Sequence, residues 1–117
     1  MNIEEYRDYC IGKKAVTESF PFDNKTLVFK VAGKMFALTG VDSFDYINLK
    51  CDPERAIELR DTYNGVKPGY HMNKQLWNSV YTEQDVPDQL IYELIDHSYE
   101  LIVASLTKKA RSEYALG

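Results

Sequence analysis

The stretch "TLVFKVAGKMFALTG", Thr26 to Gly40, decides the fold class of this chain. It is rich in residues that suit a pleated sheet, and Gly33 interrupts it near the centre. The stretch therefore predicts two strands joined by a tight turn. "DYINLK", residues 45–50, predicts a third strand, with Ile47 and Leu49 directed inward and Tyr46, Asn48 and Lys50 outward.

Helical patterns lie on both sides of these strands. Helical spacing of apolar residues predicts a first helix that ends near Gly12, and "CDPERAIELRDTYNG", residues 51–65, predicts a second. "TESFPFDN", residues 17–24, is read as a polar, proline-bearing connection. Two short strands are predicted around Gly69–Met72 and Leu76–Thr82, followed by a last long helix from Pro87 and a frayed basic tail. The order is helix, three strands, helix, two strands, helix, which predicts an α+β domain with its helices on one sheet face.

Length and composition restrict the class of protein. The 117 residues correspond to one domain, residues 1–117, and the net charge is −4. Because DNA affinity comes mainly from lysine and arginine, an acidic chain can bind DNA only if its positive charges gather on one face. No leader pattern or span of ~20 apolar residues occurs, and Cys10 and Cys51 lack metal-type spacing, so a cytoplasmic protein with reduced thiols and no membrane contact is expected.

The stretch "VKPGYHMNKQLWNSVY", residues 66–81, is the main candidate for a binding surface. Between Gly65 and Thr82 there are two lysines and no carboxylate. Its side chains can donate to phosphates or base edges, and its tryptophan can stack. The candidate contacts are Lys30 and Lys34 on the first hairpin, and His71, Asn73, Lys74, Trp77 and Asn78 on the second, with Lys108, Lys109 and Arg111 as further cations. The alternative is that Trp77 is a core aromatic and His71 bonds a neighbouring carbonyl.

Two catalytic or metal readings are weaker. Cys51 precedes the Asp52 cap of a predicted helix, which could activate a thiol with His71 as base, but a buried structural cysteine is the commoner case. Glu93, Asp96, His97 and Glu100 share helical spacings suited to an ion, but a solvated acidic face explains them as well. No nucleotide-binding, zinc-protease or serine-hydrolase motif occurs, so a non-enzymatic protein without cofactor or metal is expected.

Three longer motifs, "INLKCDPE", "PGYHMNKQLWNSV" and "DHSYELIVASLTKKAR", follow the stretch "TLVFKVAGKMFAL". Together they resemble the MmcQ/YjbR family of small bacterial proteins, from Asn2 to about Arg111. The resemblance implies helices packed against a twisted antiparallel sheet, related to the CyaY-like and secretion-chaperone-like architectures. It also implies DNA binding through a "double wing", two hairpin-like projections that straddle a duplex. It carries over no catalytic residue.

The resulting hypothesis is a non-enzymatic protein that contacts the backbone of double-stranded DNA through two strand-borne wings. The alternative is a protein-interaction module, including a dimer of this chain, in which exposed tyrosines and Trp77 face the partner.

Overall fold

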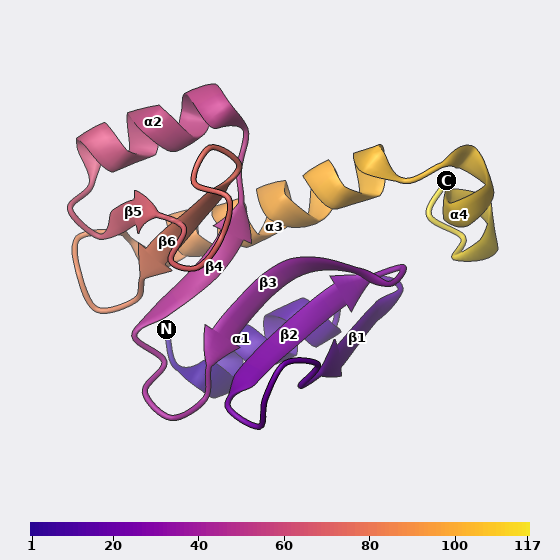
Figure 1. Ribbon diagram of the computed structural model, residues 1–117, viewed down its shortest axis with the longest axis horizontal. Helices are drawn as coiled ribbons and strands as arrows, with labels where there is room; N and C mark the ends of the chain where they lie inside the picture. Colours follow the sequence, from indigo (N-terminus) through magenta and orange to yellow (C-terminus); the bar gives the residue numbers. More distant parts are fainter.

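Six strands and four helices make up the computed structural model, which describes all residues from Met1 to Gly117 (Figure 1). In chain order the elements are α1 (Ile3–Ile11), β1 (Val16–Ser19), β2 (Thr26–Val31), β3 (Lys34–Gly40), β4 (Tyr46–Lys50), α2 (Pro53–Thr62), β5 (Val66–Pro68), β6 (Trp77–Tyr81), α3 (Asp88–Ser105) and α4 (Lys108–Glu113). None of the helices combines the length and the apolar character that crossing a bilayer requires.

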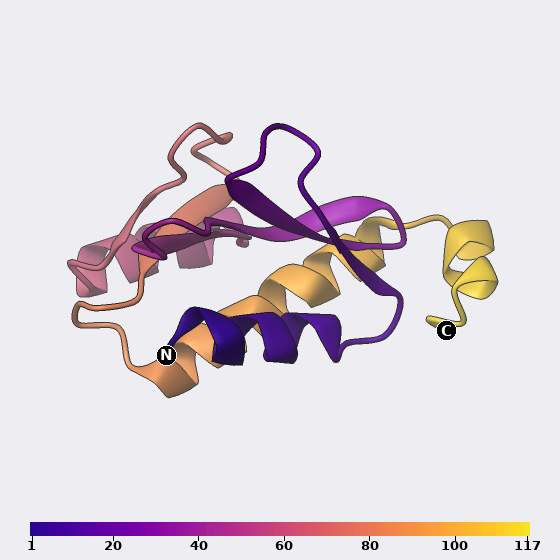
Figure 2. The ribbon, with the colours of Figure 1, turned by 90° about the horizontal axis from the view of Figure 1, so that it is seen from below.

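The strands form one antiparallel sheet in the order β1-β2-β3-β4-β6-β5. Helices α1 and α3 lie under one face of this sheet (Figure 2). Helix α2 covers the β6–β5 end of the same face, since its Ala56 and Leu59 belong to the core cluster that also contains Val66 and Val80. The predicted α+β class, with helices on one face, is confirmed. The other face carries no helix and is called the open face below.

The hairpin of β2 and β3 turns at Ala32 and Gly33, whose φ angles of 49° and 82° both lie in the left-handed region. Such a pair matches a type I′ turn, which suits the twist of a two-residue hairpin. A bulge then shifts the register: Phe29 pairs with Ala37, whereas Lys30 pairs with Met35. Phe36, the extra residue, is fully buried together with Ala37, so two consecutive residues of β3 belong to the core at the bulge.

The main core lies between the sheet and the helices. Tyr6 of α1 and both Ile91 and Ile95 of α3 are fully buried in it. The Tyr6 ring meets Phe29 of β2 edge to face, with ring centroids 5.4 Å apart. Burying aromatic and branched side chains of this size is the main favourable term in folding a chain of this length.

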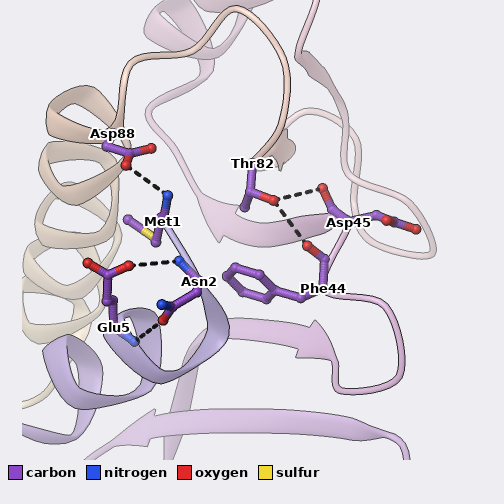
Figure 3. Close-up of polar contacts among 7 residues, drawn as sticks. All are labelled: Met1, Asn2, Glu5, Phe44, Asp45, Thr82 and Asp88. Carbon is purple, nitrogen blue, oxygen red and sulfur yellow. Dashed lines mark hydrogen bonds and ion pairs between the residues drawn. The ribbon is translucent and has the colours of Figure 1, made fainter.

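The start of α1 is fixed by a reciprocal capping box. Asn2 Oδ1 accepts from the Glu5 N–H at 2.8 Å, and Glu5 accepts from the Asn2 N–H at 3.0 Å (Figure 3). The amino group of Met1 also lies 2.7 Å from Asp88 at the start of α3. These contacts hold α1 beside α3 under the sheet.

Three elements differ from the sequence prediction. Strand β1 occupies part of the predicted connection over residues 17–24, β5 spans Val66–Pro68 rather than Gly69–Met72, and α4 replaces the predicted frayed tail. Helix α4 has its own cap, because Thr107 Oγ1 accepts from the Ala110 N–H at 3.0 Å. Residues 69–76 form a loop, and this loop shapes the site described next.

Candidate binding groove on the open face

Two loops stand above the open face of the sheet, on the side opposite α1 and α3 (Figure 2). The first joins β1 to β2 over residues 20–25, and the second joins β5 to β6 over residues 69–76. A groove with a volume of about 570 Å³ lies between them. Its lining comes from both loops and from the sheet: Phe22, Tyr70, His71, Met72 and Asn73 on the loops, and Met35, Leu38, Tyr46 and Asn48 on the strands.

The two projecting loops differ from the predicted wings. The turn of the β2–β3 hairpin is a tight one at Ala32 and Gly33, and the first projection is instead the β1–β2 loop. Sequence reasoning had treated that loop as a connection only, because it carries no hairpin signal. The second projection does come from the predicted stretch, residues 66–81.

Trp77 lies beneath the second loop. It is only 9% exposed and packs with Val28 and Leu38 in a small cluster on the open face, against which Met35 and Met72 also pack. The indole therefore fixes the loop to the sheet and is not available to stack on a ligand. The core-aromatic interpretation of Trp77 is correct, and its assignment as a nucleic-acid contact is wrong.

Asn78, another predicted contact, is also unavailable to a ligand on the open face. It is 1% exposed and pairs with Leu49 on the helix side of the sheet. Its Oδ1 accepts from Arg60 Nε of α2 at 2.7 Å. The same guanidinium donates to the carbonyls of Lys74 and Trp77, so Arg60, which sequence reasoning missed, ties the base of the second loop to α2.

Within the second loop, short-range hydrogen bonds use several of the predicted contact groups. Lys74 Nζ donates to the Gly69 carbonyl at 2.7 Å. Asn73 Oδ1 accepts from the Gln75 and Leu76 N–H groups at 3.0 and 3.1 Å, as in an Asx turn. The Asn73 amide nitrogen makes no hydrogen bond to the protein and stays free at the groove.

A polar network connects the second loop to the open face. The Tyr70 N–H donates to Ser79 Oγ at 2.9 Å, and Asn48 Nδ2 donates to the Tyr70 carbonyl at 3.1 Å. Ser79 in turn donates its hydroxyl to Asn48 Oδ1. Because both backbone groups of Tyr70 are bonded to buried side chains of β4 and β6, its position above the sheet is fixed.

The Tyr70 side chain itself remains exposed. Its ring contacts that of His71 in a tilted arrangement, with centroids 4.1 Å apart and planes at 52°, and meets Tyr46 of β4 edge to face at 6.1 Å. His71 adopts a φ of 61°, a left-handed conformation that costs energy for a residue other than glycine. The predicted alternative role of His71, a bond to a neighbouring carbonyl, is not what holds this turn, since its imidazole makes no hydrogen bond to the protein.

The sheet register sorts the lysines of the strands between the two faces. Lys30, Lys50 and Lys67 pair with Met35, Trp77 and Ser79, and all three pairs point to the open face. Lys34 instead pairs with Val31, whose side chain belongs to the core on the helix side. The two predicted contacts of the first hairpin therefore do not share a face.

Carboxylates are nearly absent from the strands. Glu18 is the only one in all six, and it pairs with Phe29 on the helix side, where Arg7 of α1 contacts it. In the first loop, Asp23 accepts the N–H groups of Lys25 and Thr26, and these hydrogen bonds lower the pKa of its carboxyl. The second loop carries Lys74 and no carboxylate.

The cations near the C-terminus lie elsewhere. Lys108, Lys109 and Arg111 of α4 line a separate hollow together with Ser112. Helix α4 lies beyond the end of α3, away from the groove (Figure 1). The fold therefore does not join these three charges to the lysines of the open face.

The geometry supports neither a reactive thiol at Cys51 nor a metal site around His97. Cys51 is 4% exposed in the core, and burial raises the pKa of its thiol to about 11, which is the opposite of activation. His97 Nε2 accepts the Asp52 N–H at 3.1 Å, and Asp96 accepts the Tyr9 hydroxyl at 2.7 Å. No three His, Cys, Asp or Glu side chains come together as a set of metal ligands.

These features define a class: a small α+β domain with one helix-covered face and one open, grooved face. Within that class the chain belongs to the YjbR family, whose sequence model matches residues 11–101. The predicted family resemblance is thereby confirmed.

Relatives extend over much of the chain. YjbR of Escherichia coli strain K12, named an uncharacterized protein, is 36% identical over 95% of both chains. YbdF of Escherichia coli O157:H7, also named uncharacterized, is 40% identical over 77% of this chain and 75% of its own. The crystal structure of Deinococcus radiodurans protein DR2400, a DUF419 domain, is similar with a TM-score of 0.92 and 38% identity, over 97% of this chain and 88% of that one. A Pseudomonas syringae crystal structure has a TM-score of 0.74 and 29% identity, over 86% of this chain and 98% of its own.

Proposed function

We propose that the chain is a non-enzymatic nucleic-acid-binding protein and that the open face, with its two loops, is the binding surface. The observation that carries this proposal is the register of the sheet. It directs Lys30, Lys50 and Lys67 to the open face, while the only strand carboxylate, Glu18, points to the other side.

Charge separation makes this binding compatible with an acidic chain. More than half of the 18 carboxylate side chains lie in α1, α2 and α3, which pack on the opposite face. Lys74 lies on the second loop, which stands above the open face (Figure 2), and its ammonium keeps two donors beyond the one that bonds the Gly69 carbonyl, so it adds a fourth cation to this side. Because phosphate binding depends on the local rather than the total charge, four lysines on one face support moderate affinity despite the net charge of −4.

The expected contacts are with the sugar–phosphate backbone. Reading base edges in the major groove of DNA relies heavily on arginine, and no arginine lies in a strand or in either loop. Arg7 instead contacts Glu18, and Arg60 holds the second loop. Lysines hold phosphates without reading sequence, so binding is expected to show little sequence preference.

The test is a fluorescence-anisotropy titration with labelled oligonucleotides at about 50 and about 200 mM salt. Four phosphate contacts predict that affinity falls by about 50-fold for a single strand and about 150-fold for a duplex over this range. Absence of binding at low salt, or binding that salt does not weaken, would contradict the proposal.

A second candidate, binding of a protein partner, has one observation in its favour. Four of the exposed large hydrophobic residues, Phe20, Phe22, Tyr70 and Leu76, lie on the two loops beside the groove. Exposed large hydrophobic side chains gathered at one site are typical of protein interfaces. Sedimentation velocity over the micromolar range tests the version in which the partner is a second copy: a strict monomer at every concentration argues against it.

A further inference from the structure

We infer that the groove takes an unpaired nucleic-acid strand rather than a duplex; this inference rests on the proposed function. It starts from two exposed aromatic rings that line the groove from opposite loops. Phe22 on the first loop is 64% exposed, and Tyr70 on the second is 56% exposed. Exposed apolar rings that line one groove are typical of a binding site.

Base faces are the natural partners of these rings. Every base has a flat π surface, so stacking on aromatic side chains accepts any sequence and contributes strongly to single-strand binding. In a duplex the faces of each base are already covered by its neighbours, and only unpaired bases offer them. Phe22 and Tyr70 therefore match an unpaired strand better than a duplex.

The Tyr70 ring is held in place before any ligand arrives. Ser79 and Asn48 bond its backbone N–H and carbonyl at 2.9 and 3.1 Å, and the rings of His71 and Tyr46 contact its ring at centroid distances of 4.1 and 6.1 Å. A ring fixed in this way loses little conformational entropy when a base stacks on it. This is the arrangement expected of a stacking platform rather than of a solvent-exposed loop residue.

Free polar groups lie beside the rings. The Asn73 amide nitrogen and the His71 imidazole line the groove and make no hydrogen bond to the protein. Both can form hydrogen bonds with the Watson–Crick edge of a base. This edge is free in an unpaired strand, whereas in a duplex it pairs with the opposite base. No carboxylate lines the groove itself.

The size of the groove agrees with this choice. A volume of about 570 Å³ lies in the range of about 300–1,000 Å³ that suits small-molecule ligands. One or a few bases fit such a space, whereas a duplex is too wide to enter and would rest on the loop tips. Lys30 and Lys50, on the open face of β2 and β4, then lie along the sheet to hold phosphates of a strand that leaves the groove.

The test compares three labelled probes of one mixed sequence, about 12 nucleotides long, a length within the ~4–16-nucleotide range of single-strand sites. The probes are single-stranded DNA, single-stranded RNA and the DNA duplex, titrated in low salt. We expect at least one unpaired strand to bind about tenfold more tightly than the duplex. The single-stranded probe that binds more tightly shows whether the groove prefers DNA or RNA. Tyr70→Ala is expected to weaken binding of the unpaired strand by about fivefold or more, with Phe22→Ala as the second variant. Tyr114→Ala is the control, because Tyr114 is an exposed ring outside the groove lining.

Each outcome decides one question. A duplex that binds as tightly as both single strands, or Tyr70→Ala and Phe22→Ala proteins that bind like the wild type, would overturn the unpaired-strand inference while nucleic-acid binding stands. No binding to any of the three probes would overturn the proposed function itself and favour a protein partner.

Discussion

The backbone N–H of Tyr70 donates to Ser79 Oγ at 2.9 Å, across the gap between the second loop and the open face of β6. Ser79 is itself bonded to Asn48 of the neighbouring strand, so the loop is attached to the sheet through buried groups. An exposed aromatic ring is thereby held above a face whose strand charges are all positive. The proposals made for this chain depend on that combination.

The lysines of the first hairpin provide a matched pair. Lys30 lies on the open face, whereas Lys34, four residues later, lies on the helix side. We expect Lys30→Gln to reduce the slope of log affinity against log salt by about 0.7 for a single strand, since one phosphate contact is lost. Lys34→Gln changes the overall charge equally and is expected to leave the slope unchanged. Equal effects of the two substitutions, measured by anisotropy, would show that the open face has no special role.

Gly69 marks a close approach between the second loop and β6. A Cβ at this position would lie 2.8 Å from Trp77 Cβ and 3.0 Å from the Trp77 carbonyl oxygen. We expect Gly69→Ala to lower the free energy of unfolding by ~1–3 kcal/mol, as overpacking typically does. A Cβ at Gly40 would meet nothing within 4 Å, so Gly40→Ala is the control, expected within ~0.5 kcal/mol of wild type. Urea denaturation measures both, and similar values for the two variants would contradict the close packing.

Arg60 joins α2 to the base of the second loop through Asn78 and two carbonyls. Arg60→Met keeps the apolar stem but leaves the buried Asn78 oxygen without this donor, at an expected loss of ~2 kcal/mol in unfolding free energy. Arg55, on the same helix, makes no side-chain hydrogen bond, and Arg55→Met serves as the control. If both variants unfold at the same urea concentration, Arg60 does not support the loop.

His97 makes stability depend on pH. Its Nε2 accepts the Asp52 N–H at 3.1 Å, which requires the neutral imidazole, and burial lowers its pKa below the ordinary value of 6.5. The unfolded chain then binds the proton at a higher pH than the folded protein does. The stabilisation is therefore complete above about pH 6.5 and declines as the pH falls through the lowered pKa.

The measurement for His97 is the free energy of unfolding between about pH 5 and pH 7.5, a window around the ordinary histidine pKa. His97→Gln is expected to lose less stability than the wild type on acidification, because the titrating group is gone. Parallel curves for the two proteins would mean that His97 does not couple folding to protons.

Much of the fold could be predicted from the sequence because the signals were local. Gly33 in the β2–β3 turn, and the Asp52 cap with Pro53 at the start of α2, each act within a few residues. Strand β1 escaped prediction, since it is a short edge strand whose half-exposed Val16 pairs with distant Val31. Nothing in its four residues identifies that partner.

The candidate site was harder to predict, because the face of the sheet to which a side chain points depends on which strands pair and in which register. Alternation in residues 45–50 did direct Tyr46 and Lys50 outward, as the register shows. In the β2–β3 hairpin the two-residue turn pairs Val31 with Lys34 and Lys30 with Met35, so Lys30 and Lys34 lie on different faces. The chemistry of Trp77 suited a contact, but its burial follows from Val28 and Leu38, which come from another part of the chain.

The central claim is that the open face binds nucleic acid, and nuclear magnetic resonance can test it residue by residue. A backbone amide titration with the single-stranded oligonucleotide is predicted to shift signals from the two loops, residues 20–25 and 69–76, and from Lys30 and Lys50. Signals from α1 and from α4, which carries the separate basic hollow, are predicted to stay in place. Shifts confined to α4 or the helix side, or no shifts at all, would contradict the account.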